Sequence, residues 1–370
     1  MSTQSLIGRH KRLLALLLVL IMLTGLVSIA PAVPVQAAGS ALSANTVTVK
    51  AAGRSFAVKT VRIPKGTATA IGLADHQIGH TASLAAIASS YGAKAGINGA
   101  FFDSYGGPPD PYGTLISGGR LQHIGRYGTT IGFTANGTAM MDSLRIEVSG
   151  NVSPPQGRSS SWYAVWFNRT PSTTATGTSI VYTPDRGATT GSHVGVAVTV
   201  RQGKVVAKAN NTNTAIPSNG YVLVFTGDMK SMADRFVVGA QVTMDIRYTN
   251  IDGKAIPWEN VVTAVGAGPR LVTDRKLTLN AAAEGFQDPK ILNASGARSG
   301  IAIMADGSVM IATVSGATMK QWAAVMQKLG AVQAMNLDGG ASSGMIAGGK
   351  VVTSPGRLLS NALLFGGSGN

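Results

Sequence analysis

One carboxylate stands in the stretch NLDGGASSG, which begins at Asn336 and follows the apolar run AVQAM. The apolar run predicts a buried strand, so Asp338 is expected where that strand ends. Gly339 and Gly340 let the backbone approach a ligand closely, because glycine carries no Cβ. Ser342 adds a hydroxyl group. These residues predict a catalytic carboxylate with polar neighbours, although an aspartate in a turn can also cap nearby N–H groups.

A second polar set, Asn98, Gly99 and Asp103, lies in the stretch GINGAFFD. The preceding residues LAAIASSYGAKAGIN align without gaps with WAAVMQKLGAVQAMN, which ends at Asn336. Each stretch predicts a helix, a Gly-Ala stop, a short strand and then Asn. A common supersecondary pattern could produce the same match. A shared geometry would place Asn98 and Asn336 at equivalent strand ends, side by side in one sheet, where ligands often bind.

Three arginines lie close to glycine, a context in which a guanidinium group can bind phosphate through two parallel hydrogen bonds. They are Arg270 in GAGPRLV, Arg298 in GARSG and Arg357 in SPGRLL. Each of them taken alone could equally be a surface charge.

Other chemistries fit the residues less well. GASSG has the spacing of a serine-hydrolase nucleophile elbow, but that motif needs an acid and a histidine later in the chain, and no Asp, Glu or His follows Asp338. His76 and His80 have helical spacing without the glutamate of a zinc-protease helix. Calcium at Asp103 and Asp110 stays an open alternative without an EF-hand-like run, so we predict no metal and no cofactor.

The composition points to anionic partners. The chain has 370 residues and a formal charge of +15, which suits wall polymers or phosphorylated glycans. Its basic residues are dispersed, so no nucleic-acid partner is predicted. The sequence contains no cysteine, and therefore neither a disulfide nor a lipid-bearing cysteine is available.

The first 37 residues have the pattern of a secretory signal peptide. RHKR is a positive region, an apolar run follows, and VQA offers a small-x-small cleavage pattern. The apolar run is also long enough to be a marginal membrane anchor, but Pro31 and Pro34 favour cleavage. We expect a secreted or envelope-associated protein without stable membrane insertion after cleavage. Residues 38–64 are expected to be a leader with short strands, and 65–370 a catalytic domain.

Periodicity predicts an α+β fold: one catalytic domain with a mixed, largely antiparallel sheet and a few packed helices. Apolar stripes predict helices from Ser83 to Tyr91 and from Met319 to Leu329, each followed by a glycine stop. Between about Thr129 and Val265 many short β-rich runs alternate with turn residues. IAIMADGSVMIATV predicts a hairpin, in which Asp306-Gly307 would form a tight primed turn.

The motifs NGAFFD, GAGPRLV, ARSGIAI, NLDGGASSG and NALLF occur in this order and resemble the phosphodiester glycosidase family. The similarity extends across about 91–365 through FNRT at Phe167, VYTP at Val181 and IPSNGYVL at Ile216. Two positions depart from the family's usual pattern. Ala341 stands where a third glycine is usual, which would be harmful only at positive φ, and Ala297 stands where proline is frequent.

This resemblance implies an enzyme that cleaves a sugar-1-phosphodiester between the anomeric carbon and the bridging oxygen. The sugar could be N-acetylglucosamine-like, or part of a wall or capsule glycan phosphate. Phosphate leaves readily as an anion, so a guanidinium group can replace the proton donor of ordinary glycosidases. Asp338 would then be nucleophile or base, Asp103 the second carboxylate, and Arg298 the first choice for phosphate. The expected substrate-binding residues are Asn98, Gly99, Asn336, Gly339, Gly340, Ser342, Arg270 and Arg357.

Two other functions stay open. A non-catalytic module could bind anionic wall polysaccharide through its positive charge, with salt-sensitive adhesion and no turnover. A hydrolase of the same fold could act on a glycan without phosphate, in which case the three arginines would matter little.

Overall fold

The computed structural model describes residues 42–172 and 176–367, so the predicted signal peptide lies outside the described residues. A seven-stranded antiparallel sheet contains the two strands of the first described hairpin and the strand that leads to Asp338. Its order is β1 (Ala44–Ala51), β2 (Arg54–Ile63), β22 (Val309–Ala317), β21 (Gly296–Ile303), β23 (Gln333–Asn336), β19 (Arg270–Thr273) and β20 (Lys276–Leu277). Of the strands expected in the leader, β1 pairs with β2 and β2 pairs with β22, inside the same compact unit, Ala41–Asn370.

Two five-stranded sheets surround the centre of this unit. One has the order β25 (Lys350–Thr353), β24 (Met345–Ala347), β4 (Ala95–Asn98), β26 (Asn361–Phe365) and β3 (Thr69–Leu73). The other has the order β6 (Arg120–His123), β5 (Leu115–Ser117), β18 (Val261–Gly266), β7 (Thr130–Thr134) and β8 (Ala139–Asp142). Ile97, Ile131 and Ile301, one from each of the three sheets, share a hydrophobic core.

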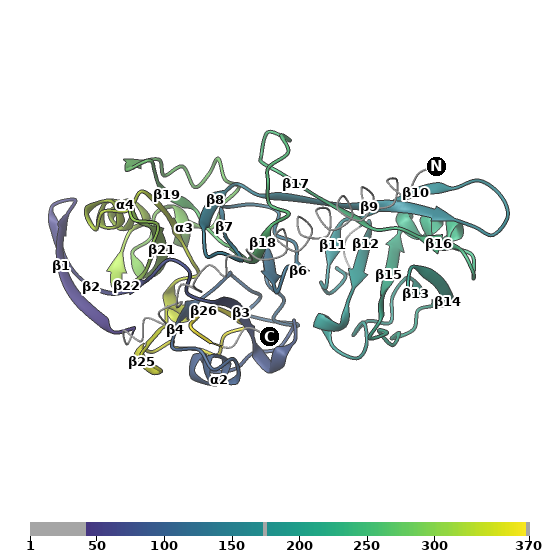
Figure 1. Ribbon diagram of the computed structural model, residues 1–370, viewed down its shortest axis with the longest axis horizontal. Helices are drawn as coiled ribbons and strands as arrows, with labels where there is room; N and C mark the ends of the chain where they lie inside the picture. The colour runs from purple at the N-terminus through teal and green to yellow at the C-terminus, as the bar shows by residue number, and fades with distance from the viewer. Residues whose placement is uncertain (1–41, 173–175, 368–370) are drawn as a thin grey trace, which may run out of the picture. The chain divides into compact units, whose positions relative to one another are not determined.

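A nine-stranded sheet contains most of the β-rich middle of the chain (Figure 1). Its order is β10 (Ser160–Ala164), β9 (Arg145–Ser153), β16 (Gln241–Val242), β14 (Lys204–Asn210), β13 (Val196–Arg201), β15 (Gly220–Gly227), β12 (Gly177–Tyr182) and β11 (Trp166–Phe167), and β17 (Asp245–Thr249) also pairs with β9. Among the described strands, β11 and β12 form the one parallel pair. Trp162, Phe225 and Phe236 fill the core of this sheet.

The helices are short. They are α2 (Leu84–Ser90), α3 (Pro289–Leu292), α4 (Met319–Lys328) and the 3₁₀ turns η1 (Ala74–His76), η2 (Pro184–Arg186), η3 (Asp228–Arg235) and η4 (Gly340–Ser342). Both predicted helices, α2 and α4, are confirmed. Thr318 caps α4 through its hydroxyl group, and Gly330 ends it at φ +88°. The helix buries Trp322 and Val325, and each such side chain contributes about 1.5–3 kcal/mol.

Three expectations need correction. The fold is largely β, with fewer helical residues than an α+β fold implies, although the antiparallel character is confirmed. The hairpin from β21 to β22 is confirmed, but its turn is not of the primed type, because Gly307 alone has positive φ and Asp306 does not. The two similar helix–strand units do not share a sheet: Asn98 ends β4 and Asn336 ends β23, in different sheets.

In the described part of the chain, none of the helices has the length and apolar character needed to span a membrane.

Candidate active site

The segment after β23 is fixed by hydrogen bonds from the end of β4. The Asp338 N–H donates to the carbonyl oxygen of Gly99 at 3.1 Å. The Asn98 side chain donates to the carbonyl oxygen of Asp338 at 2.7 Å and accepts from the Gly344 N–H at 3.0 Å. The two polar sets therefore meet although their strands belong to different sheets, and the backbone of Asp338 is held on both sides.

The glycines shape this turn for different reasons. A Cβ on Gly339 would lie 2.9 Å from the carbonyl oxygen of Ala297, so a side chain there would push the turn away from β21. Gly340 has φ +59°, in the left-handed region that favours glycine. Ala341 does not have positive φ. Alanine therefore fits at the position where the family usually has glycine.

Asp338 is half-buried, and its carboxyl group is hydrogen-bonded. Its Oδ1 accepts from the Gly339 N–H at 2.8 Å, and the Ser342 hydroxyl group donates a further hydrogen bond. Burial raises the pKa of Asp338 to about 6, although these two hydrogen bonds and the charge of Arg357 act to lower it. Asp338 therefore changes protonation in the mildly acidic range, as catalytic carboxyl groups often do.

A cleft of about 500 Å³ lies beside this turn. Its lining consists of Thr81, Phe102, Asp103, Ser104, Gly106, Gly107, Pro109, Ala341, Gly356, Arg357 and Leu358. Ala341 comes from η4, three residues after Asp338, and Asp103 is the second predicted carboxylate. The cleft therefore brings the second predicted carboxylate and one of the three predicted arginines next to the turn that follows Asp338.

Arg357 is the cation of this cleft. Its Nη1 donates to the Ser104 hydroxyl group, and its Nη2 lies 3.4 Å from the Tyr105 hydroxyl group. Its guanidinium group also lies 5.2 Å from the centre of the Tyr105 ring. No carboxylate of the described residues forms an ion pair with Arg357, so its charge acts on Asp338 and on whatever enters the cleft.

Arg298 occupies a different environment. Its side chain is buried, with 3% exposure, and donates to the carbonyl oxygens of Ala317 (2.9 Å), Lys290 (3.0 Å) and Ala294 (2.5 Å). Burial lowers the pKa of Arg298. The guanidinium group lies behind Gly339, where a Cβ would be 3.9 Å from its Nη1. Arg298 thus holds neighbouring backbone segments behind the turn, whereas the charge that lowers the pKa of Asp338 is that of Arg357.

Arg270 is placed away from the cleft lining. Its Nη2 donates to the Gln333 side chain at 2.8 Å, and its backbone N–H donates to Glu284 at 2.6 Å. Asn336 is fully buried, and its side chain donates to the Gly268 carbonyl oxygen at 3.0 Å. Asn98 is also buried, at 1% exposure. The polar atoms of these side chains bond to other parts of the protein, so few of them are free to bind a sugar.

Gly99 lies against Asn361, whose side-chain oxygen occupies the space that a Cβ would need. Asn361 also accepts from the Ala100 N–H at 2.7 Å. The asparagine of NALLF therefore fixes the same segment that holds Asp338. Sequence reasoning missed Tyr105 and Ser104 as partners of Arg357; the signal was their position directly after Asp103.

The described residues contain no group of three or more His, Cys, Asp or Glu arranged to hold a metal ion. Asp110, considered for calcium, instead pairs with Arg186 at 2.6 Å. His80 lies 3.0 Å from Asp75. His123 is buried with its Nδ1 2.8 Å from the Gly113 carbonyl oxygen, and burial lowers its pKa to about 4.

A partly buried carboxylate beside an unpaired guanidinium group in a cleft is the kind of site that acts on an anionic substrate. The family model for phosphodiester glycosidases matches residues 194–366. This range contains Asp338 and Arg357 and ends before the chain does, whereas Asp103 lies outside it. The resemblance to this family seen in the motifs is therefore confirmed.

Solved structures show the same fold. A hypothetical protein from Synechocystis superposes with a TM-score of 0.74 at 24% identity, over 87% of this chain and 61% of that one. An exported protein from Burkholderia pseudomallei gives 0.69 at 25% identity, over 84% and 74%. The catalytic domain of zebrafish N-acetylglucosamine-1-phosphodiester α-N-acetylglucosaminidase, auto-inhibited by its pro-peptide, gives 0.50 at 12% identity, over 89% and 84%. The chain thus spans about three fifths of the Synechocystis protein. No curated protein matches at a significant level.

Proposed function

We propose that this protein is an exported glycosidase that hydrolyses the C1–O bond of a sugar-1-phosphodiester, releasing free sugar and a phosphomonoester. The observation that carries the proposal is a cleft lined by Asp103, Arg357 and Ala341, three residues after Asp338, together with the charge of Arg357 acting on Asp338. The family match supports the reaction class. The N-terminal pattern supports export, and the Burkholderia relative is itself described as exported.

Asp338 is the carboxylate that attacks the anomeric carbon or activates water. Its fixed backbone keeps the carboxyl group in place, and its raised pKa makes it a better base than a free aspartate. Asp103, which lines the cleft, contacts a sugar hydroxyl group or serves as the second carboxylate. The sugar is N-acetylglucosamine-like or part of a wall or capsule glycan phosphate.

Arg357 takes the role of phosphate ligand. It lines the cleft and carries an unpaired charge, so it can stabilise the negative charge that develops on the departing phosphate. Arg298 is instead a positioning residue, because three of its hydrogen bonds go to backbone carbonyl oxygens. Gly340, where a Cβ would meet no atom within 4 Å, leaves room for the substrate to approach the turn closely.

The test is an assay of free sugar released from methyl N-acetylglucosamine-1-phosphate diester. We expect Asp338→Asn to lower kcat by at least about a hundredfold, because the attacking or base function is lost. The matched control is Asp234→Asn, which changes an exposed aspartate in η3 and should leave kcat within twofold of wild type, roughly the range of neutral surface changes.

Full activity in Asp338→Asn would remove this residue from the mechanism. An absence of turnover by wild type, together with salt-sensitive binding to an anionic polysaccharide that Asp338→Asn retains, would instead identify a binding module.

A further inference from the structure

Two arginines outside the cleft lining stack on one indole ring. The guanidinium carbon of Arg169 lies 4.5 Å from the centre of the Trp166 ring, and that of Arg126 lies 4.8 Å from it. Arg169 also lies 5.5 Å from the centre of the Tyr112 ring. Stacking on aromatic faces holds a guanidinium group in a defined plane while its N–H groups stay free. Arg169 belongs to the FNRT motif, to which the proposed reaction assigns no role.

These charges lack partners. Within residues 42–172 and 176–367, neither Arg126 nor Arg169 forms an ion pair with a carboxylate. Arg126 donates one hydrogen bond, to the Val165 carbonyl oxygen. The side chain of Arg169 donates none to the part of the chain that is described.

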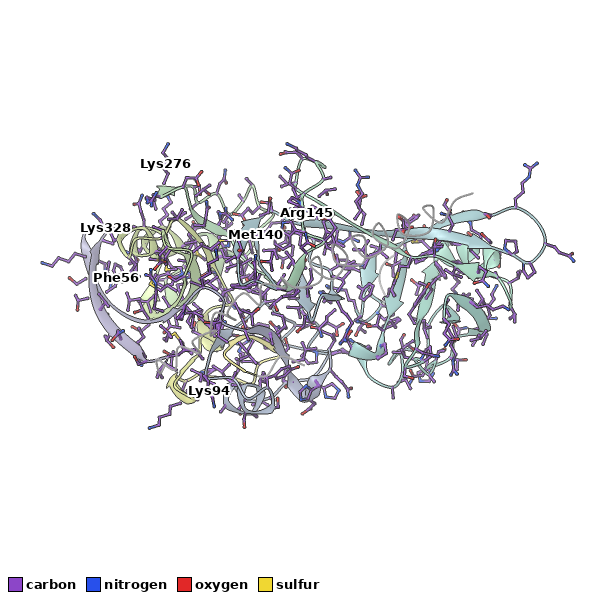
Figure 2. All side chains as sticks on the ribbon, in the orientation of Figure 1. Phe56, Lys94, Met140, Arg145, Lys276 and Lys328 are labelled. Carbon is purple, nitrogen blue, oxygen red and sulfur yellow. The ribbon has the colours of Figure 1, made fainter. Side chains whose placement is uncertain are left out.

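The arginines are also close enough to repel one another. Burial lowers the pKa of Arg126, and the charges of Arg145 and Arg169 lower it further. Arg145 stands at the start of β9 (Figure 2). A cluster of like charges that folding holds together is unfavourable by itself, and a bound anion would relieve the repulsion.

The cluster is connected to the candidate active site through Tyr112. The Tyr112 N–H donates to the Phe101 carbonyl oxygen at 2.8 Å, and Phe101 is two residues from Gly99, which holds Asp338. Two residues of extended chain span about 7 Å. Tyr127 lies between the same groups: burial raises its pKa, and the charges of Arg169 and Asp338 both act on it, Arg169 lowering it and Asp338 raising it.

We propose that Arg126 and Arg169, stacked on Trp166, form an anion-binding subsite that takes a second phosphate or carboxylate group of the same substrate. The preferred substrate is then a glycan chain with repeated negative charges, rather than a sugar phosphate with one. As a substrate assignment this rests on the proposed function, whereas anion binding at Trp166 can be tested separately.

The kinetic test compares two diesters of N-acetylglucosamine-1-phosphate: one with a methyl aglycone and one whose alkyl aglycone ends in a second phosphate. We expect wild type to prefer the second substrate. Arg169→Gln should lower the ratio of kcat/KM values, charged over methyl, about tenfold, the loss typical of one charge-assisted hydrogen bond. The control is Arg54→Gln, an exposed arginine that also stacks on an aromatic ring, 5.6 Å from Phe56 on the β1–β2 hairpin (Figure 2). An unchanged ratio in Arg169→Gln overturns the proposal.

A binding test separates this idea from the proposed reaction. Of the four tryptophans, Trp162, Trp258 and Trp322 are buried and Trp166 is partly exposed, so a ligand at the subsite should change Trp166 fluorescence. Titration with inorganic pyrophosphate should give a saturable change in wild type and Arg54→Gln, with the Kd raised about tenfold in Arg169→Gln. Saturable binding without cleavage of either diester would reject the proposed reaction and keep the subsite. No saturable change in wild type, or equal weakening in Arg54→Gln, would reject the subsite.

Discussion

At the residue scale, the activity of Asp338 depends on its charge state. A carboxylate that attacks carbon or accepts a proton must be ionised, and the pKa of Asp338 is raised to about 6. We therefore expect kcat/KM to fall as pH decreases through about 6, with a tenfold loss for each further pH unit. The measurement is a pH–rate profile on a sugar-1-phosphodiester whose own groups do not titrate between pH 4 and 8.

Arg357 supplies the check on this assignment. Its charge lowers the pKa of Asp338, so Arg357→Gln should move the acidic limb to higher pH, and Arg357→Lys should move it back. A profile whose activity instead falls as pH rises above 6 would make Asp338 a proton donor. A limb that Arg357→Gln leaves in place would mean that another group controls it.

The roles of individual side chains were only partly predictable from sequence. Asp338 and Asp103 were singled out because each follows a strand and lies near glycine or asparagine, and their catalytic roles stay predictions. The arginines were ranked with Arg298 first, but Arg298 and Arg357 have similar neighbours in sequence and opposite environments in the fold. Arg298 faces backbone carbonyl oxygens, whereas Arg357 faces the cleft. Burial depends on the packing of distant segments, which a local motif does not contain.

At the scale of elements, the joint between β4 and the Asp338 turn depends on Asn98. Its side chain satisfies the carbonyl oxygen of Asp338 and the N–H of Gly344, both far away in sequence. Asn98→Ala should leave these groups unpaired and lower the free energy of unfolding by about 2–4 kcal/mol. It should also lower kcat, because the Asp338 turn loosens. Urea denaturation and steady-state kinetics measure the two effects.

Asn210→Ala is the matched control, because Asn210 is exposed at the end of β14. It should change stability by less than about 0.5 kcal/mol. If Asn98 instead bound the sugar, as the sequence suggested, Asn98→Ala would raise KM while stability stayed near that of wild type. That outcome would contradict the structural role.

Elements defined by local patterns were predicted well, and their partners were not. The apolar stripes of α2 and α4 and the glycines that end these helices lie within short continuous segments, so both helices can be predicted from sequence. The sheet of β4 and the sheet of β23 are separate because β4 pairs with β24 and β26, which lie about 250 or more residues later in the chain. The sequence similarity of the two helix–strand units reflects the same local structure, but it does not indicate which strands pair with one another.

At the scale of the whole described unit, the motifs FNRT and VYTP connect the nine-stranded sheet to the cleft. The Thr170 N–H donates to Asp110 at 2.6 Å, and Asp110 pairs with Arg186. Both side chains of this pair are buried, with 8% exposure for Asp110 and 7% for Arg186. The Asp110 carbonyl oxygen accepts from the Asp103 N–H at 3.0 Å. The pair lies 76 positions apart in sequence, so no motif could have indicated it.

This connection predicts that stability and activity fall together when the pair is broken. Arg186→Ala leaves Asp110 buried and unpaired, which should lower the free energy of unfolding by about 3–5 kcal/mol. The same substitution at Arg62 breaks an exposed pair with Asp306, which water and salt screen, and should change stability far less. Urea denaturation at pH 7 compares the two variants directly.

The double variant Asp110→Ala/Arg186→Ala separates the charge effect from the packing effect. It leaves no unpaired buried charge, so it should be more stable than Arg186→Ala alone. Its kcat should nevertheless stay low, because the segment from Asp103 to Asp110 has lost its anchor to η2 while Asp103 still lines the cleft. Recovery of stability together with full kcat would show that Asp103 acts independently of the nine-stranded sheet. A double variant no more stable than the single one would show that packing, rather than charge, makes Arg186 important.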